Sequence, residues 1–204
     1  DDYFLDNRFS IVADIFNKNP DADGVYEAIG THYYDEIGKK LHQKRMGEIN
    51  EHQNYSELTT LTRIVKPELL FSELLTGKCG WFHFNALTLK KSVFLKVGLL
   101  DTSMKVGEDT DLFFRLAIQA RLYPGCLDEP VALRGVYEGN GTLSVFTDSE
   151  RIELDNYFNA YMWRKFFMKI KDNQFTLDAN RFLTFKHLDY YNTKIIKMPM
   201  GNKR

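Results

Sequence analysis

Carboxylate side chains gather at two points of the sequence where they could take part in chemistry. Glu108, Asp109 and Asp111 lie together directly after a glycine, and Asp1 and Asp2 open the chain. A carboxylate can act as the general base for a hydroxyl group, and its oxygens are preferred ligands of Mg²⁺ and Mn²⁺. Acidic residues at a helix start also stabilise its exposed N–H groups without any chemical role. Residue type alone therefore leaves both interpretations open.

The acidic group after Gly107 is expected to sit at the start of an amphipathic helix from Glu108 to Ala120. Apolar residues recur there at helical spacing on one face, at Leu112, Leu116, Ala117 and Ala120. Arg115 follows Asp111 by four residues, which brings the two charges together on the helix surface. We therefore predict that Arg115 is the structural partner of Asp111.

Strands and helices are expected to alternate around this helix. The predicted strands are Val25–Ile29, Leu58–Val65, Phe84–Leu89 and Val131–Tyr137. The predicted helices are Asn7–Asn17, a segment from Pro67 to Gly77, Lys90–Val97, Ser149–Lys171 and Leu177–Tyr191. The polar segment from Gly30 to Asn54 shows little periodicity and is expected to be irregular or a hairpin. Alternating elements of this kind predict an α/β fold.

Composition excludes several classes of protein. The 204 residues are 44% hydrophobic and 27% charged, which indicates a globular chain with a real core rather than a disordered or fibrous one. No apolar run is long enough for a spanning helix, and no signal peptide opens the chain, so we expect a cytoplasmic location. Cys79 and Cys126 show neither metal nor redox spacing, which fits a reducing compartment. His32, His42 and His52 recur at a period that matches neither a helix nor a strand, so a histidine metal cluster is not expected.

Positive charge is concentrated at the C-terminal end. Residues 161–204 carry ten Lys/Arg and three Asp/Glu, and the other residues carry 17 and 25, so net charges of +7 and −8 sum to −1. Such a segment is either a solvated tail or a surface that meets something anionic. Nucleic acid is not expected as the partner, because no known binding motif is present. We predict a peripheral membrane contact at this end, with the nearby aromatic residues packed in the helix core.

The acidic residues belong to three sequence motifs, which follow one another along the chain near residues 1–9, 97–116 and 134–144. Residues 107–116 read Gly-Glu-Asp-Thr-Asp-Leu-Phe-Phe-Arg-Leu, after a short basic helix ending in Val97-Gly98 and the pair Leu100-Asp101. Asp1-Asp2-Tyr3-Phe4 is followed by Asn7-Arg8-Phe9, and residues 134–144 read Arg-Gly-Val-Tyr-Glu-Gly-Asn-Gly-Thr-Leu-Ser. Over most of residues 1–145, the sequence resembles the second half of family-2 glycosyltransferases of the GT-A fold. In that family these stretches are the helix with the base, the segment after the D-x-D motif, and the loop that closes over the site.

The resemblance implies a partial GT-A domain over residues 1–147, with a mixed sheet and flanking helices, and a C-terminal helical extension over residues 148–204. It implies that Asp109 is the general base for inverting transfer. Glu108, Asp111 and Arg115 then orient the base and its helix. Asp1 is the last aspartate of D-x-D and binds Mg²⁺ or Mn²⁺ on the donor diphosphate, beside Asp2. The acceptor-side candidates are Trp81, His83, Asn85, Arg134 and Tyr137.

Two departures from the family pattern affect what this chain can bind. Many relatives place a metal-binding histidine where this sequence has Tyr137, and a neutral phenol is a poor ligand for Mg²⁺. The first strands of the nucleotide-binding half do not precede Asp1, although a doubly wound site needs them. We therefore expect the isolated chain to bind a sugar nucleotide poorly.

The leading hypothesis is transfer of a sugar from a nucleotide-sugar donor to a glycan or lipid-linked acceptor in surface polysaccharide synthesis. The alternative is a non-catalytic sugar-binding or interaction module that keeps part of the fold. A metal-dependent hydrolase is a third hypothesis, but the sequence offers no His/Asp ligand cluster for it. Exposed sheet edges make a homodimer a further expectation.

Overall fold

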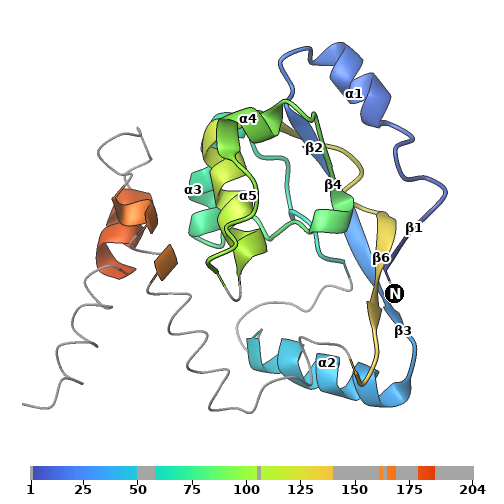
Figure 1. Ribbon diagram of the computed structural model, residues 1–204. Helices are drawn as coiled ribbons and strands as arrows, with labels where there is room; N and C mark the ends of the chain where they lie inside the picture. Colours follow the sequence, from blue (N-terminus) through green and yellow to red (C-terminus); the bar gives the residue numbers. More distant parts are fainter. Residues whose placement is uncertain are drawn as a thin grey trace, which may run out of the picture.

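The computed structural model is an α/β protein with mixed sheets and flanking helices, as the sequence predicts (Figure 1). It describes residues 2–49, 58–104, 107–139, 161–162, 165–168 and 179–186. Two three-stranded sheets form its centre. One has the strand order β1-β6-β3 and the other β4-β2-β5, and each contains both parallel and antiparallel neighbours.

The first sheet carries the N-terminal acidic residue. It contains β1 (Tyr3–Phe4), β3 (Ala28–Tyr33) and β6 (Pro130–Val136). Strand β6 is parallel to β3 and antiparallel to β1, with Tyr3 opposite Leu133. The beginning of β1 therefore lies at the carboxyl ends of β3 and β6, the edge where open α/β sheets commonly bind ligands.

The predicted strand Val25–Ile29 is two strands in different sheets. Strand β2 (Gly24–Tyr26) pairs with β4 (Leu87–Leu89) and β5 (Leu122–Pro124), whereas β3 starts at Ala28 in the other sheet. Between them the Glu27 side chain is fully buried; it forms an ion pair with Arg8 and accepts a hydrogen bond from the Cys126 backbone N–H at 3.4 Å. The chain thus changes sheets at a buried ion pair, a feature that an uninterrupted β-type sequence does not reveal.

The helix that carries the acidic group forms as predicted. Helix α5 (Glu108–Gln119) packs against α3 (Leu70–Leu75) and α4 (Val93–Val97), and the four residues predicted to face inward are all buried. Helix α3 follows the 3₁₀ turn η1 (Pro67–Leu69), so proline does start this helical segment. Aromatic rings fill the core around α5, where Phe82 and Phe113 pack edge to face at 4.9 Å between centroids.

The polar segment predicted to be irregular contains a helix, so that prediction is wrong. Helix α2 (Glu36–Ile49) contacts the end of β3 and β6. It packs through Gly38 and His42 rather than an apolar stripe: a Cβ at Gly38 would lie 2.6 Å from the backbone of Tyr137, and His42 Nδ1 lies 3.0 Å from the Tyr33 hydroxyl. Asp35 caps the start, since its Oδ1 accepts from the Gly38 N–H at 2.6 Å.

Three other predicted elements are shorter than expected or absent. Residues 58–65 form isolated bridges, at Thr59 and Leu61, in place of a strand. The segment from Phe84 begins with the 3₁₀ turn η2 (Phe84–Ala86) and becomes extended only in β4. The first helix, α1 (Val12–Lys18), starts later than predicted because Phe9 has φ of 75° and the preceding residues turn toward the Arg8–Glu27 ion pair.

The described parts of the C-terminal region are helical over residues 161–162, 165–167 and 179–186. Met162, Phe166, Ala179 and Leu183 are buried in the same hydrophobic cluster as α3 and α5, and the Phe166 ring lies 5.2 Å from that of Phe114. Most of the predicted helices Ser149–Lys171 and Leu177–Tyr191 lies outside the described residues. Within the part of the chain that is described, no helix is both long and apolar enough to cross a membrane.

Candidate functional site

Asp109 lies in the first turn of α5. Gly107 precedes the helix with φ of 74°, a left-handed conformation that glycine adopts without steric cost. The Asp109 Oδ1 accepts a hydrogen bond from the Thr110 N–H at 2.6 Å, and the Thr110 hydroxyl lies 3.3 Å from the same oxygen. Among the described residues, the second carboxylate oxygen has no hydrogen-bond partner. Asp109 therefore presents an acceptor oxygen that is held in place through its neighbour.

Asp2 is fixed at the carboxyl end of the first sheet. Its Oδ1 accepts from the backbone N–H of Gly135 on β6 at 2.8 Å, and its Oδ2 accepts from Nδ2 of Asn85 at 2.6 Å. These bonds join the start of the chain to β6 and to the turn η2. Asn85 and Asp2 are separated by 83 positions in sequence, so only the fold brings them together.

His83 precedes the η2 turn, and the charges of both Asp2 and Asp109 act on its ring. Its Nδ1 accepts a hydrogen bond from the Asn85 backbone N–H at 3.3 Å, which caps η2. Burial lowers the pKa of His83, and the positive charge of Arg134 lowers it further, whereas the charges of Asp2 and Asp109 act in the opposite direction. His83 is therefore neutral at pH 7, and since Nδ1 is an acceptor, its hydrogen is on Nε2.

Five predicted site residues form a group that we call the polar cluster: Asp2, His83, Asn85, Asp109 and Arg134. Hydrogen bonds join Asp2 to Asn85 and Asn85 to His83, and the charges of Asp2, Asp109 and Arg134 all act on the His83 ring. They come from the start of β1, the η2 turn, the first turn of α5 and strand β6. The cluster combines carboxylate acceptors, a neutral imidazole N–H donor and a guanidinium. Such a set can hold a hydroxyl group between a base and a donor, beside a positive charge that suits an anion.

Asp111 and Arg115 lie on the same helix but belong to a different environment. The Asp111 side chain is fully buried; its Oδ2 lies 2.7 Å from Arg115 Nε, and its Oδ1 lies 2.7 Å from Lys165 Nζ. The prediction that Arg115 pairs with Asp111 is confirmed. Arg115 also donates to the backbone carbonyls of Val97 and Leu99, so it ties α5 to the loop after α4.

The remaining predicted site residues take other positions. Trp81 packs on aromatic neighbours of the core, with ring centroids 5.4 Å from Phe114 and 6.1 Å from Phe113. Tyr137 follows β6, and its ring packs edge-on against Tyr34 at 6.5 Å. Glu108 is half-buried beside Asp109. Asp1 and residues 140–144 of the predicted closing loop lie outside the described residues.

Sequence reasoning did not single out the residues that hold the cluster in place. Gly135 contributes a backbone N–H, which no side-chain pattern reveals. Thr110 fixes Asp109, and the buried Arg8–Glu27 ion pair anchors the segment that follows β1, with the Arg8 guanidinium 4.6 Å from the Phe9 ring centroid. The only sequence signal for this anchor is a charged residue, Glu27, inside an apolar run.

Of the two residues predicted to lie at the divalent metal, Asp1 and Asp2, the structure describes Asp2. Within the described ranges, no three His, Cys, Asp or Glu side chains are grouped so as to hold a metal ion. Mg²⁺ is often bound by one or two carboxylates together with substrate phosphates, so Asp2 beside Asp1 fits a site of that kind. Both oxygens of Asp2 accept hydrogen bonds, from Asn85 and from Gly135, so a cation bound there would share these oxygens with the two donors.

Comparison with known proteins gives a distant likeness to a glycosyltransferase. The chain is 22% identical over 201 residues to a Haemophilus influenzae protein named "Uncharacterized glycosyltransferase". The match covers 97% of this chain and 59% of the relative. This likeness supports a glycosyltransferase relationship. No protein-family profile matches the chain, and no solved structure matches it.

Proposed function

We propose that the chain carries the acceptor side and catalytic base of an inverting glycosyltransferase of the GT-A type. The observation that carries the proposal is the polar cluster, in which Asp109 keeps one carboxylate oxygen without a hydrogen-bond partner among the described residues and its charge, like that of Asp2, acts on the buried imidazole of His83. The whole enzyme would transfer a sugar from a nucleotide-sugar donor to a glycan or lipid-linked acceptor in surface polysaccharide synthesis. The chain spans 59% of the related glycosyltransferase, so other segments would supply the nucleotide site.

In the proposed reaction, Asp109 takes the proton of an acceptor hydroxyl as its oxygen attacks the anomeric carbon of the donor sugar. The bond from that carbon to the diphosphate breaks on the opposite face, which inverts the configuration and releases the nucleoside diphosphate. His83 donates a hydrogen bond from Nε2 to the acceptor and fixes its orientation. A carboxylate held by Thr110 keeps one oxygen directed to the hydroxyl, which lowers the cost of aligning the reactants.

Asp2, Asn85 and Arg134 would form the donor side of the cluster. Hydrogen bonds from Asn85 and Gly135 hold Asp2 in one position, next to the charge of Arg134. When bound by Asp1 and Asp2, Mg²⁺ or Mn²⁺ would offset the negative charge of the leaving diphosphate. Arg134 would contribute positive charge to the same group or to an acidic sugar.

The test is a donor screen on the full-length protein with Mn²⁺ present, in which release of the nucleoside diphosphate is measured with and without candidate acceptors. We expect acceptor-dependent release with one class of donor. Asp109→Asn serves as the control, because release that depends on contaminating enzymes would not change in this variant. Sugar binding without release from any donor would contradict the proposal.

A second candidate function is a sugar-binding module without transfer. It is favoured by the fact that both oxygens of Asp2 are already engaged by Asn85 and Gly135. This candidate predicts that glycan affinity, measured by calorimetry, is retained when Mn²⁺ is removed and that no donor is consumed.

A further inference from the structure

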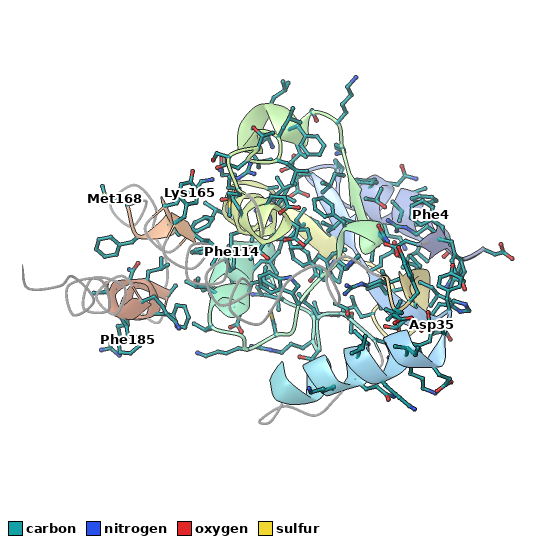
Figure 2. All side chains as sticks on the ribbon, turned by 60° about the horizontal axis from the view of Figure 1, so that its bottom comes forward. Phe4, Asp35, Phe114, Lys165, Met168 and Phe185 are labelled. Carbon is teal, nitrogen blue, oxygen red and sulfur yellow. The ribbon has the colours of Figure 1, made fainter. Side chains whose placement is uncertain are left out.

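Two exposed phenylalanine rings lie side by side near Asp2. Phe4 is 58% exposed and Phe9 is 50% exposed, and their ring centroids are 5.8 Å apart with the ring planes at 77°. We call these two side chains the phenylalanine pair. Figure 2 shows Phe4 at the end of the molecule opposite to Phe185. Folding gains little from these rings, because about half of each remains in water.

A buried cation supports the phenylalanine pair. The Arg8 guanidinium lies 4.6 Å from the centroid of the Phe9 ring and 5.5 Å from that of Phe4. Arg8 is itself fixed by its ion pair with the fully buried Glu27. Cation–π contact with a guanidinium held in this way restricts the motion of both rings. A ligand would therefore meet a preformed aromatic surface, which reduces the ordering cost of binding.

The backbone at Phe9 is strained. Among the non-glycine residues that the structure describes, Phe9 alone has a positive φ, of 75°, and this conformation is costly for a bulky side chain. Glycine or asparagine would adopt it at lower cost. Burial does not explain an exposed ring on a strained backbone, and strain of this kind is typical of functional sites. The strain therefore favours a ligand at the phenylalanine pair.

The phenylalanine pair adjoins the polar cluster. Phe4 lies opposite Ala132 in the pairing of β1 with β6, and Arg134 follows Ala132 by two residues on β6. Phe4 and Arg134 therefore project from the same face of the sheet. Phe4 also follows Asp2 by two residues, and two residues of extended chain span about 7 Å. This span is comparable to one pyranose residue of a glycan, so the neighbour of a sugar held at the polar cluster would reach Phe4.

We propose that the phenylalanine pair is a subsite for the second sugar residue of an oligosaccharide acceptor, with a C–H face of that sugar stacked on the Phe4 ring. A pyranose has C–H groups on its faces and hydroxyl groups at its edge, so aromatic rings beside carboxylate, amide and guanidinium groups match both parts. An acyl chain would contact the rings but leave these polar groups without partners.

This inference rests on the proposed function, because it takes the sugar that accepts the transfer to be held by the polar cluster. It narrows the acceptor to a glycan of at least two sugar residues. It also gives Phe4 and Phe9 a role in acceptor specificity that is separate from the chemistry at Asp109.

Titration of the full-length protein with sugars, followed by calorimetry and NMR, tests the proposal. The probes are the disaccharides cellobiose, lactose and diacetylchitobiose and the monosaccharides glucose, galactose and N-acetylglucosamine. We expect at least one disaccharide to bind about tenfold more tightly than its monosaccharides, because only the disaccharide reaches the second subsite. The protons on one face of its second ring should shift upfield, since they lie over the Phe4 ring.

Phe4→Ser should reduce the affinity for that disaccharide to the level of its monosaccharides and abolish the upfield shift. Phe4→Tyr should retain both, because the ring remains. Phe9→Asn should weaken disaccharide binding with an unchanged or higher melting temperature, since asparagine tolerates the left-handed conformation. Phe185→Ser is the matched control: Phe185 is 65% exposed at the opposite end of the molecule, so this variant should leave every affinity unchanged.

Two results would overturn the proposal. One is that no disaccharide binds more tightly than its monosaccharides, or that Phe4→Ser leaves the affinity unchanged. The other is a Phe4→Ser variant that melts at lower temperature or loses self-association while sugar binding is unchanged. The phenylalanine pair would then be covered by another part of the protein or by a second copy.

The proposed function can fail separately, because these titrations need no donor. Disaccharide binding that depends on Phe4, without release of a nucleoside diphosphate from any donor, would support the subsite and contradict sugar transfer. Normal transfer to a disaccharide by Phe4→Ser, with unchanged affinity, would contradict the subsite and leave the proposed reaction in place.

Discussion

Two carboxylates on the first turns of α5 show how surroundings separate a structural residue from a candidate catalytic one. Asp111 is fully buried and contacts two cations, Arg115 and Lys165, each at 2.7 Å. Asp109, two residues earlier, accepts hydrogen bonds only from its neighbour Thr110 among the described residues, and it belongs to the polar cluster with His83. The first carboxylate has its charge neutralised inside the protein, whereas the second keeps one oxygen without a hydrogen-bond partner among the described residues.

The same contrast extends to two basic side chains, Lys165 and His83. Burial lowers the pKa of Lys165, but the hydrogen bonds and charges of Asp111 and Asp101 outweigh it, so that the pKa is raised overall. Lys165 is therefore a permanent positive charge between two carboxylates. His83 shows the opposite outcome, since burial and Arg134 lower its pKa and keep the ring neutral. Charges are neutralised in pairs in the first region, whereas the second keeps a neutral ring that can donate a hydrogen bond.

The largest expected effect comes from Asp109→Asn in the full-length protein. Asparagine keeps an oxygen for the Thr110 N–H but cannot take a proton, so turnover should fall by about 10²–10⁴-fold. The melting temperature and donor affinity should stay close to those of the parent protein. Initial rates, donor titration and thermal unfolding measure all three quantities, and a stable variant with normal turnover would remove Asp109 from the mechanism.

Asp111→Asn should act on stability instead. It leaves two buried or half-buried cations without their shared carboxylate, so the free energy of unfolding should fall by about 3–5 kcal/mol. Urea unfolding followed by circular dichroism measures the change. Asp14→Asn is the matched control, because Asp14 is exposed on α1 and should change stability little. A loss under about 1 kcal/mol for Asp111→Asn would contradict the assigned structural role.

His83→Asn should have a smaller effect, with a pH signature. The asparagine oxygen replaces Nδ1 as the acceptor for the Asn85 N–H, but the Nε2 donor is lost, so turnover should fall about tenfold.

The pH dependence of stability gives a second readout for His83. Its pKa in the folded protein is below the ordinary value of 6.5, so the unfolded chain binds the proton first as pH falls. The parent protein should therefore lose stability on acidification from about pH 6.5 to the lowered pKa, and His83→Asn should lose less. Denaturant midpoints across this range measure the difference; identical pH profiles would contradict a neutral buried imidazole.

Glu108→Gln should have the smallest effect. Glu108 is half-buried and belongs to neither the polar cluster nor the Asp111 ion pairs. Turnover should therefore change by less than about threefold, and the free energy of unfolding by less than about 0.5 kcal/mol. The same assays apply. A loss of turnover as large as that of Asp109→Asn would contradict the choice of Asp109, rather than Glu108, as the base.

The sequence predicted best where a strong periodic signal determines the structure. Helix α5 is strongly amphipathic, and its bounds and inward residues agree with the prediction. Helix α2 was missed because it packs through Gly38 and His42, which do not form an apolar stripe, although Asp35 was a usable N-cap signal. The break between β2 and β3 depends on a buried ion pair at Glu27, and local pattern does not encode its distant partner.

The sequence predicted which residues belong to the polar cluster but not how those residues are bonded to one another. Family resemblance singled out Asp2, His83, Asn85 and Arg134, and the fold brings them together with Asp109. The protonation of His83 could not be inferred, because it depends on burial and on a charge from β6. The bond from Asn85 to Asp2 likewise requires the three-dimensional path of the chain. Both features depend on contacts between residues far apart in the sequence, which a local sequence pattern does not show.

The most direct test of the central claim is a structure of the full-length protein with an acceptor sugar and a nucleoside diphosphate bound. The account predicts a hydroxyl oxygen of the acceptor within about 2.6–3.2 Å of a carboxylate oxygen of Asp109, with Nε2 of His83 directed at the same sugar. Asp111 should remain paired with Arg115 and Lys165, away from both ligands. An acceptor bound elsewhere, with Asp109 still contacting Thr110 alone, would contradict the account.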